Sequence, residues 1–204
     1  MLARRQGGVS VPESKPIGRV VRSSSHTDYV CRIFDDADQS PAPVPADYPF
    51  GGFVRLGDAI GVIYRSELLN PDYAVVGPRL SASESVRQIV TPDLIHERAT
   101  LVGILLLGEG RDGQAWQGVP GPVVPVHSVV TTLADPAFLA FHRDPGGRLQ
   151  VRYYPLLLSQ TGPIGPSLLL TILTRLEGLV SPEEQALLRV LRTSVNWQTT
   201  MAGT

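Results

Sequence analysis

The stretch FGGFVRLGDAIGVIYRSEL, residues 50–68, decides the fold of this chain. Two apolar runs, 50–56 and 59–68, are separated by the pair Gly57-Asp58. An apolar run, a Gly-Asp pair and a second apolar run together are a strong signal of a β-hairpin. We therefore expect two paired strands here, at the centre of a mainly β domain.

The segments around this hairpin extend the β prediction. Residues 99–108 are continuously apolar and predict a buried strand, and residues 147–159 alternate before becoming apolar, which predicts a strand entering a core. Two more short strands are expected at 17–21 and 28–34, joined by the polar turn 22–27. The proline content of residues 118–126 favours an extended edge or an ordered loop. Short helices are expected at 81–90 and, as a helix or turn, at 135–143.

The C-terminal part of the chain has the pattern of helices and not of strands. Residues 167–178 have helical length, and Gly178 stands where a C-terminal cap belongs. Residues 181–197 begin with Ser181 as N-cap, Pro182 at the first helical position and Glu184 completing a capping box. These two segments predict a helical hairpin. Because residues 168–176 are apolar around most of the first helix, we expect an apolar strip that pairs with a second copy or a partner.

Composition limits the possible functions. The 204 residues include 18% charged residues and carry a formal net charge of −1, which argues against non-specific nucleic-acid binding. Residues 1–15 have the composition of a flexible leader; its arginines could contact phosphate, but a solvated tail is favoured. The opening residues contain no apolar run, so we expect no signal peptide and a cytoplasmic protein. Residues 153–174 carry no charge, but glycines and prolines in their middle argue against a membrane span.

Lysine usage argues against nucleotide chemistry. Lys15 is the only lysine, so neither a phosphate loop nor a Schiff-base lysine is available in the rest of the chain. Residues 156–173 have the order of a strand, a glycine-containing turn and a helix, which is the order of a phosphate loop. However, Pro166 replaces the lysine and Gln160 the first glycine. We therefore expect no ATP hydrolysis, and a plain strand-to-helix turn rather than an anion site at 159–167.

The remaining polar residues form no recognisable site. The histidines, His26, His96, His127 and His142, have no metal-binding spacing. The stretch SSSHTD, 23–28, is better explained as a polar turn than as part of a hydrolase, and the acidic residues at 35–38 lack calcium-loop spacing. Trp116, Tyr153 and Tyr154 are too scattered for a base-stacking platform, and the single cysteine, Cys31, is expected to be a buried structural thiol. We therefore assign no catalytic, cofactor-binding or metal-binding residue. Without a recognisable catalytic motif, the sequence favours a binding function.

The order of several segments is similar to that of a known family. The segments are IGRVV (17–21), SSSHTDYV (23–30), FGGFVRL (50–56), AIGVI (59–63), SELLNPDY (66–73), ERATLVGILLL (97–107), VPGPVVPV (119–126) and DPAFLAF (135–141). Over residues 16–145 the chain resembles the HAS-barrel, the β-barrel that begins HerA-type DNA translocases. In that family an ATPase motor follows, and residues 153–176 look like a remnant of its first strand, loop and helix without the lysine.

The resemblance implies a small β-barrel at 16–160, preceded by the leader 1–15 and followed by a helical segment at 161–204. It also implies a non-catalytic module for oligomerisation or partner docking in a DNA-processing system concerned with repair and end resection. The partner would be a HerA-like ATPase, a NurA-like nuclease or a second copy. Two alternatives stay open: an enzyme with an unrecognised site in the acidic region 35–100, and a sensor that holds a small ligand at the mouth of its barrel.

Overall fold

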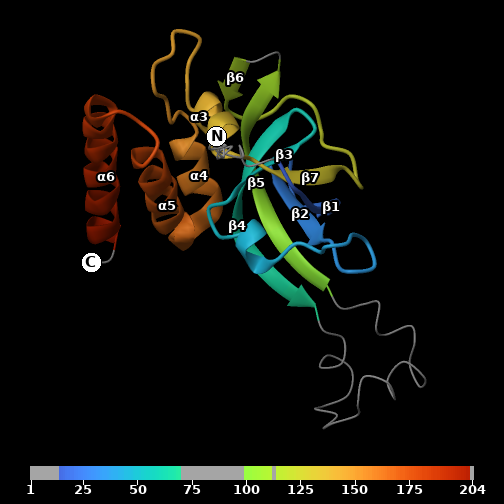
Figure 1. Cartoon of the computed structure of the whole chain (residues 1–204). Helices are drawn as coiled ribbons and strands as arrows, with labels where there is room; N and C mark the ends of the chain where they lie inside the picture. The colour runs from blue at the N-terminus through green and yellow to red at the C-terminus, as the bar shows by residue number, and fades with distance from the viewer. Residues whose placement is uncertain (1–13, 70–98, 112–113, 203–204) are drawn as a thin grey trace, which may run out of the picture.

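The computed structural model describes residues 14–69, 99–111 and 114–202, and within them it contains a closed antiparallel barrel beside a layer of helices (Figure 1). Strands β1, β2, β5, β4, β3 and β7 follow one another around the barrel, and the pairing of β2 with β5 closes this six-stranded ring. The strands are β1 (Pro16–Ser23), β2 (Asp28–Ile33), β3 (Phe53–Leu56), β4 (Ala59–Leu69), β5 (Ala99–Arg111), β6 (Gln114–Gln117) and β7 (Val129–Thr132). Strand β6 pairs only with β5 and lies outside the ring. The predicted fold class is confirmed.

The hairpin expected at residues 50–68 is present as β3 and β4. Leu56 pairs with Ala59, so the turn has the two residues Gly57 and Asp58. Gly57 has a φ of 63°, a conformation that glycine adopts without the steric cost of a side chain. The local turn signal therefore set the pairing of the two strands. Strand β5, which closes on β4, was also expected from its apolar run.

The barrel interior is filled by side chains. Ile17, Val54, Ile63, Ile104 and Val130 are among the residues buried inside it. Cys31 is fully buried in the same cluster, and burial raises the pKa of its thiol to about 12. A thiol with so high a pKa is a poor nucleophile at neutral pH. The interpretation of Cys31 as a structural residue is confirmed.

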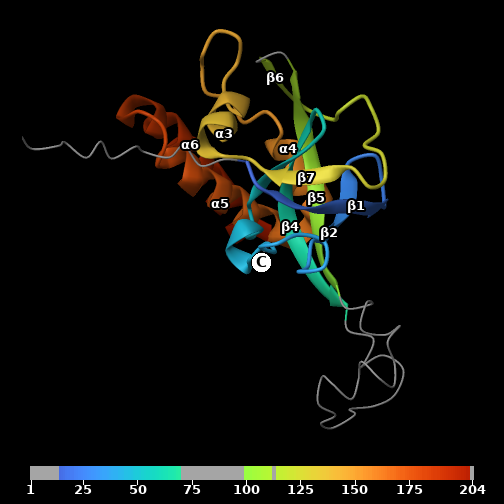
Figure 2. The ribbon, with the colours of Figure 1, turned by 45° about the vertical axis from the view of Figure 1, so that its right-hand side comes forward.

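Helices cover one outer face of the barrel, as Figures 1 and 2 both show. They are α3 (Asp135–Phe141), α4 (Tyr154–Thr161), α5 (Gly165–Glu177) and α6 (Pro182–Ala202). Buried side chains of β3, β4 and β5 pack against α3, α4 and α5 in a second core, and α6 lies outside α5. The hairpin α5–α6 was predicted, and its capping box is present: Ser181 N–H donates to Glu184 Oε2 at 3.2 Å, and Glu184 N–H donates to Ser181 Oγ at 3.4 Å.

The strand predicted at 147–159 is wrong. Residues 154–161 form helix α4, and before it only Leu149 makes an isolated bridge, to Arg143. Pro155 lies in the first turn of α4, where its missing N–H is not needed, and Leu157 is buried against the core. A short apolar run cannot distinguish a buried strand from a buried helix, which explains the error. Two strands were not foreseen, β6 and β7, and the helix proposed at 81–90 lies outside the described residues.

The helical stretch Tyr154–Glu177 is long and apolar enough to cross a membrane by length and composition. In this fold it is interrupted by a 3-10 turn at Gly162–Ile164, where Gly162 has a φ of 56°. Six of its apolar residues are buried against the barrel and against α6: Leu157, Leu168, Leu169, Ile172, Leu173 and Leu176. Tyr154 and Ile164 are 39% and 41% exposed, and 39% of the apolar window is buried, so the core covers part of this stretch.

Lys15 is part of the barrel and not of the leader to which the sequence assigned it. Its N–H donates to Thr132 Oγ1 at 2.9 Å, and its carbonyl accepts the N–H of Thr132 at 2.8 Å. The ammonium group forms an ion pair with Asp47 at 2.5 Å, and this hydrogen bond lowers the pKa of the Asp47 carboxyl. The extent of the leader was inferred from composition, which does not reveal a pairing across more than a hundred residues.

We expect deletion of residues 1–13 to leave the melting temperature nearly unchanged and deletion of residues 1–15 to lower it by several degrees. The longer deletion removes two hydrogen bonds to Thr132 and the ion pair with Asp47, each worth about 1 kcal/mol or less. One kcal/mol corresponds to roughly 2–4 °C for a domain of this size. Calorimetry on both truncated proteins is the measurement. Equal losses from the two deletions would contradict this assignment of Lys15.

Candidate docking surface

The loop between β6 and β7, residues 118–128, is an irregular segment that is constrained by its prolines. Pro120, Pro122 and Pro125 each fix their own φ, and each restricts the residue before it to an extended conformation. Each of residues 119–125 except Val123 is either a proline or the residue before a proline. The loop contains no regular strand, as its prolines predicted, and it is held in place by the rest of the barrel.

Three side chains from other parts of the fold clamp this loop. The ring of His26 lies 2.7 Å from the carbonyl oxygen of Pro120, which can only accept, so Nε2 is the donor. Glu109 Oε1 accepts the N–H of Gly121 at 2.7 Å. The buried hydroxyl of Tyr29 accepts the N–H of Val124 at 3.1 Å. Because the clamps come from the β1–β2 turn, β5 and β2, the loop position follows from the barrel itself.

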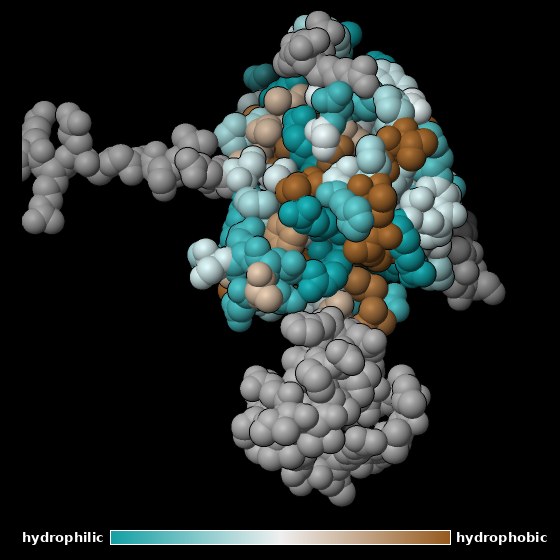
Figure 3. Space-filling model, turned by 90° about the vertical axis from the view of Figure 1, so that its right-hand side faces the viewer, coloured by the Kyte–Doolittle hydropathy of each residue, from teal (hydrophilic) through white to brown (hydrophobic). Residues whose placement is uncertain are grey.

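The clamped loop presents apolar side chains to solvent. Val119, Val123 and Val126 are 45%, 65% and 58% exposed, and Pro122 and Pro125 between them are also exposed. We call these five residues the valine ridge. Two further exposed valines, Val21 and Val129, lie on the adjacent strands β1 and β7. Figure 3 looks at the side of the molecule that carries β1, β7 and this loop, and it shows hydrophobic surface in a broken strip.

A strained turn ends the ridge. Ser128 N–H donates to the carbonyl of Pro125 at 3.2 Å, and His127 between them has a φ of 65°. His127 is the one non-glycine residue with positive φ among those that the structure describes. Such a conformation carries a steric cost and persists only where surrounding contacts impose it; here His127 N–H donates to the carbonyl of Val20 at 2.8 Å. The fold thus maintains an unfavourable turn next to exposed Val126.

A shallow pocket of about 190 Å³ lies between the ridge and the β3–β4 turn. Its walls are mostly apolar and include Leu56, Pro122 and Val123, with Asp58 and Glu109 contributing carboxylates. Pockets that bury a drug-sized ligand usually measure about 300–1,000 Å³. This pocket is smaller than that range, and a small ligand held in the barrel mouth, one of the alternatives, stays a prediction.

The histidines that were considered as metal ligands lie in separate places. His26 contacts the loop, His127 forms the strained turn, His142 is buried on the helical side, and His96 lies outside the described residues. Among the residues that the structure describes, no group of three or more His, Cys, Asp or Glu side chains is placed to hold a metal ion. The absence of a metal site in the protein stays a prediction.

The polar turn at 23–28 does not assemble a hydrolytic triad. Ser24 Oγ donates to Asp28 at 2.8 Å, while the ring of His26 is directed to Pro120 instead. The other oxygen of Asp28 accepts the hydroxyl of Tyr64 at 2.8 Å. The side chain of Asp28 therefore joins β2 to β4, and the interpretation of residues 23–28 as a structural turn is confirmed.

The segment compared with a phosphate loop has another geometry. Residues 159–167 join helix α4 to helix α5 through a 3-10 turn, so no strand precedes the glycine. The strand, loop and helix that were expected here are therefore wrong: the segment consists of two helices joined by a 3-10 turn. The acidic residues at 35–38, which were compared with a calcium loop, lie in a surface loop. Two of them, Asp35 and Asp38, form ion pairs with Arg32 at 2.7 and 2.6 Å.

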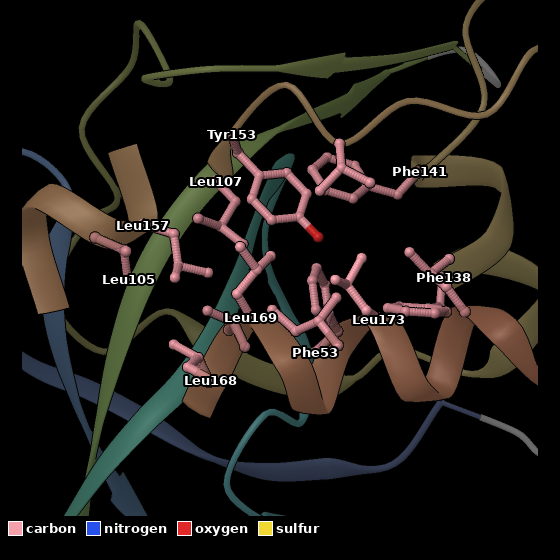
Figure 4. Close-up of a cluster of buried hydrophobic side chains, with 14 of the residues drawn as sticks. Phe53, Leu105, Leu107, Phe138, Phe141, Tyr153, Leu157, Leu168, Leu169 and Leu173 are labelled. Carbon is pink, nitrogen blue, oxygen red and sulfur yellow. The ribbon is translucent and has the colours of Figure 1, made fainter. Parts of the chain in front are cut away.

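One buried polar pair was not expected from the sequence. His142 is fully buried; its Nδ1 lies 2.7 Å from the carbonyl of Phe138, and its Nε2 lies 2.7 Å from the hydroxyl of Tyr153. Because the carbonyl only accepts, Nδ1 carries the proton and Tyr153 donates to Nε2. Figure 4 shows the Tyr153 hydroxyl directed into the cluster of phenylalanines and leucines. Burial lowers the pKa of His142 to about 4, so the ring is neutral at physiological pH.

The outer face of α6 carries a second exposed apolar pair. Leu187 and Val190 are 63% and 69% exposed, whereas Leu188 and Val195 on the inner face are buried against α5. The apolar strip expected from residues 168–176 is not exposed on α5, because α5 is covered by the barrel side and by α6.

The fold and the surface define a small antiparallel β-barrel with a helical flank and a rigid apolar loop. The chain matches the family described as a domain of unknown function (DUF8166) over residues 3–204, and it belongs to that family. No curated protein matches the chain.

Proposed function

We propose that this chain is a non-catalytic module that docks a partner protein within a HerA/NurA-like DNA-processing system. The observation that carries docking is the valine ridge, an exposed apolar surface held rigid by His26, Tyr29 and Glu109. Burying a valine is worth about 1.5 kcal/mol or more, so an ordered row of exposed valines favours association. The resemblance to the HAS-barrel supplies the system, and the six-stranded barrel is compatible with the small β-barrel that this resemblance implies.

The described polar side chains support a binding role over a catalytic one. Asp28, Arg32 and His142 are each engaged in bonds that join elements of the fold, and Lys15 pairs with Asp47. Reactive groups at catalytic sites are usually placed in a cleft with a perturbed pKa. Three groups with strongly perturbed pKa values, Cys31, His142 and Tyr153, are buried inside the two cores. The pKa of Glu184 is lowered to about 2 mainly by its bond to Arg143, and that of Tyr64 is raised to about 12 mainly by burial.

The partner that the proposal names is a protein and not a nucleic acid. The net charge of −1 does not favour non-specific binding to phosphate backbones. The ridge offers proline and valine side chains, which contact apolar protein surface and form no hydrogen bonds with base edges. The HerA-like ATPase and the NurA-like nuclease are therefore the first proteins to test.

Titration calorimetry of the full chain against a purified HerA-like ATPase and a purified NurA-like nuclease from the same genome tests the proposal. We expect one of them to bind with a dissociation constant in the micromolar range or below, with a negative heat-capacity change from apolar burial. Size-exclusion chromatography with light scattering provides the stoichiometry. If neither protein binds, the proposed function is wrong.

A further inference from the structure

We infer that the valine ridge acts as a preformed ligand that inserts into a concave, aromatic-lined groove on the partner protein. This inference rests on the proposed docking function and adds to it the shape and chemistry of the partner surface. Val119, Pro122, Val123, Pro125 and Val126 carry it.

The ridge is organised before binding. Proline and pre-proline restrictions cover six of the seven residues 119–125, and three side chains clamp the loop at Pro120, Gly121 and Val124. Ordering a flexible segment on binding costs conformational entropy for each side chain that becomes immobilised. A loop that is already ordered avoids most of this cost. Val124 turns inward, where it is 7% exposed, so the constraint serves to direct its neighbours Val123 and Pro125 outward.

The side chains of the ridge determine the chemistry of its counterpart. The stretch VPGPVVPV, residues 119–126, has no charged or hydrogen-bonding side chain. A protein that covers it gains energy from apolar contact, and a polar groove would lose its water without compensation. Extended proline-containing segments characteristically dock in grooves lined by aromatic rings, which match flat proline faces. Pro122 and Pro125 are spaced three apart, as in the PxxP pattern of such ligands.

The residues beside the ridge favour a different protein over a second copy. A second copy presents the same valines and prolines, and no aromatic residue lines the pocket next to the ridge. The pocket beside the ridge is shallow, and Pro122 and Val123 themselves form part of its wall.

The test compares two double variants of the full chain against whichever of the two purified proteins, the HerA-like ATPase or the NurA-like nuclease, binds the wild type. Val123→Asp with Val126→Asp changes the ridge. Leu187→Asp with Val190→Asp makes the same chemical change at equally exposed positions on α6 and is the matched control. Because all four positions are more than half exposed, both variants are expected to keep the wild-type melting temperature.

We expect the ridge variant to bind at least about tenfold more weakly and the control to bind like the wild type. Wild-type binding with no loss in the ridge variant would overturn this inference and leave the proposed docking function standing. No binding of the wild type to either protein would overturn both. A ridge variant that dissociates a wild-type dimer in light scattering would assign the ridge to a second copy instead.

A second readout addresses the aromatic lining and does not depend on a variant. In the wild type with carbon-13-labelled valine methyl groups, the methyl signals of Val123 and Val126 should move upfield when the partner is added, because they enter the shielding region of aromatic rings. Val21 and Val129, which lie on the barrel wall, provide internal references. Binding without an upfield shift at Val123 and Val126 would contradict an aromatic groove.

Discussion

Replacing Leu169 and Leu173 by aspartate should unfold the helical layer of this protein rather than separate an oligomer. Both side chains are at most 2% exposed in the core between the barrel and α5. Each substitution loses about 1.5–3 kcal/mol of apolar burial and introduces a carboxylate without a partner, which costs several kcal/mol more. The sum exceeds a stability of about 5–15 kcal/mol that is typical of a domain, or removes most of it. Circular dichroism during thermal and urea unfolding is the measurement.

The matched control for this prediction is Leu187→Asp with Val190→Asp on the outer face of α6. These side chains are 63% and 69% exposed, so we expect a change of less than about 1 kcal/mol in the free energy of unfolding. Equal destabilisation by the two double variants would contradict the assignment of α5 to the core. Dissociation of an oligomer by the Leu169 and Leu173 variant, with helicity retained, would instead support an exposed apolar strip on α5.

The features that the sequence predicted correctly depend on local chemistry. Gly57-Asp58 selects a two-residue turn, and that turn fixes how β3 pairs with β4. Ser181 and Glu184 satisfy each other's backbone groups at the start of α6, so the capping box could be recognised from two residues. In both cases the determining contacts are three or four residues apart.

The features that were missed depend on contacts between distant residues. Strand β7 has only four residues, and it is a strand because β1 and β3 pair with its two edges. Helix α4 was mistaken for a strand because the apolar run at 156–158 suits either structure until the barrel wall defines what it packs against. Lys15 was assigned to the leader because its partners, Asp47 and Thr132, are far along the chain.

The candidate surface was foreseen only as an ordered proline-rich loop. Proline content predicted that residues 118–126 would not form a central strand, but not which side chains would face solvent. That depends on Tyr29, Glu109 and His26, whose bonds to the loop span between 12 and 95 residues of sequence. The strained φ of His127 could not be inferred either, because non-glycine residues rarely adopt it.

Acid should destabilise the protein through His142, beginning near pH 6.5, where its carboxylates are still ionised. The ring is buried and neutral, and its pKa is lowered from 6.5 to about 4 by burial, with the charge of Arg175 acting in the same direction. Below pH 6.5 the unfolded chain binds a proton at this residue that the folded chain does not bind until about pH 4. The stability contributed by the neutral ring is therefore complete above pH 6.5 and is lost as the pH falls towards 4. The expected loss is about 3 kcal/mol.

The groups around the His142 ring show why the folded protein does not stabilise a proton on it. Phe53, Phe138 and Phe141 surround the imidazole with ring centroids 4.4–5.4 Å away, and Tyr153 is the one titratable group bonded to it. The charged group that acts on the pKa of His142 is Arg175, whose guanidinium lies over the ring of Phe138 at 4.0 Å and is paired with Asp135. Protonated His142 would thus meet a second cation and no free carboxylate among these groups, so the folded state resists the proton.

Urea unfolding at pH 7.0, 5.5 and 4.5 measures this loss, and His142→Phe with Tyr153→Phe is the variant that isolates it. The double variant removes both members of the hydrogen-bonded pair, so neither is left unsatisfied by the other, and Phe suits the aromatic surroundings. Its free energy of unfolding should change little between pH 7.0 and 4.5, whereas that of the wild type falls steadily. Glu184, whose pKa is lowered to about 2 mainly by Arg143, loses its contribution to stability only as the pH falls below about 4.5, and it is present in both proteins.

If the variant does not fold, the His142 ring signals of the wild type decide the question by nuclear magnetic resonance. Titration of that ring near pH 6.5 in the folded protein would show that His142 is not the origin of the acid sensitivity.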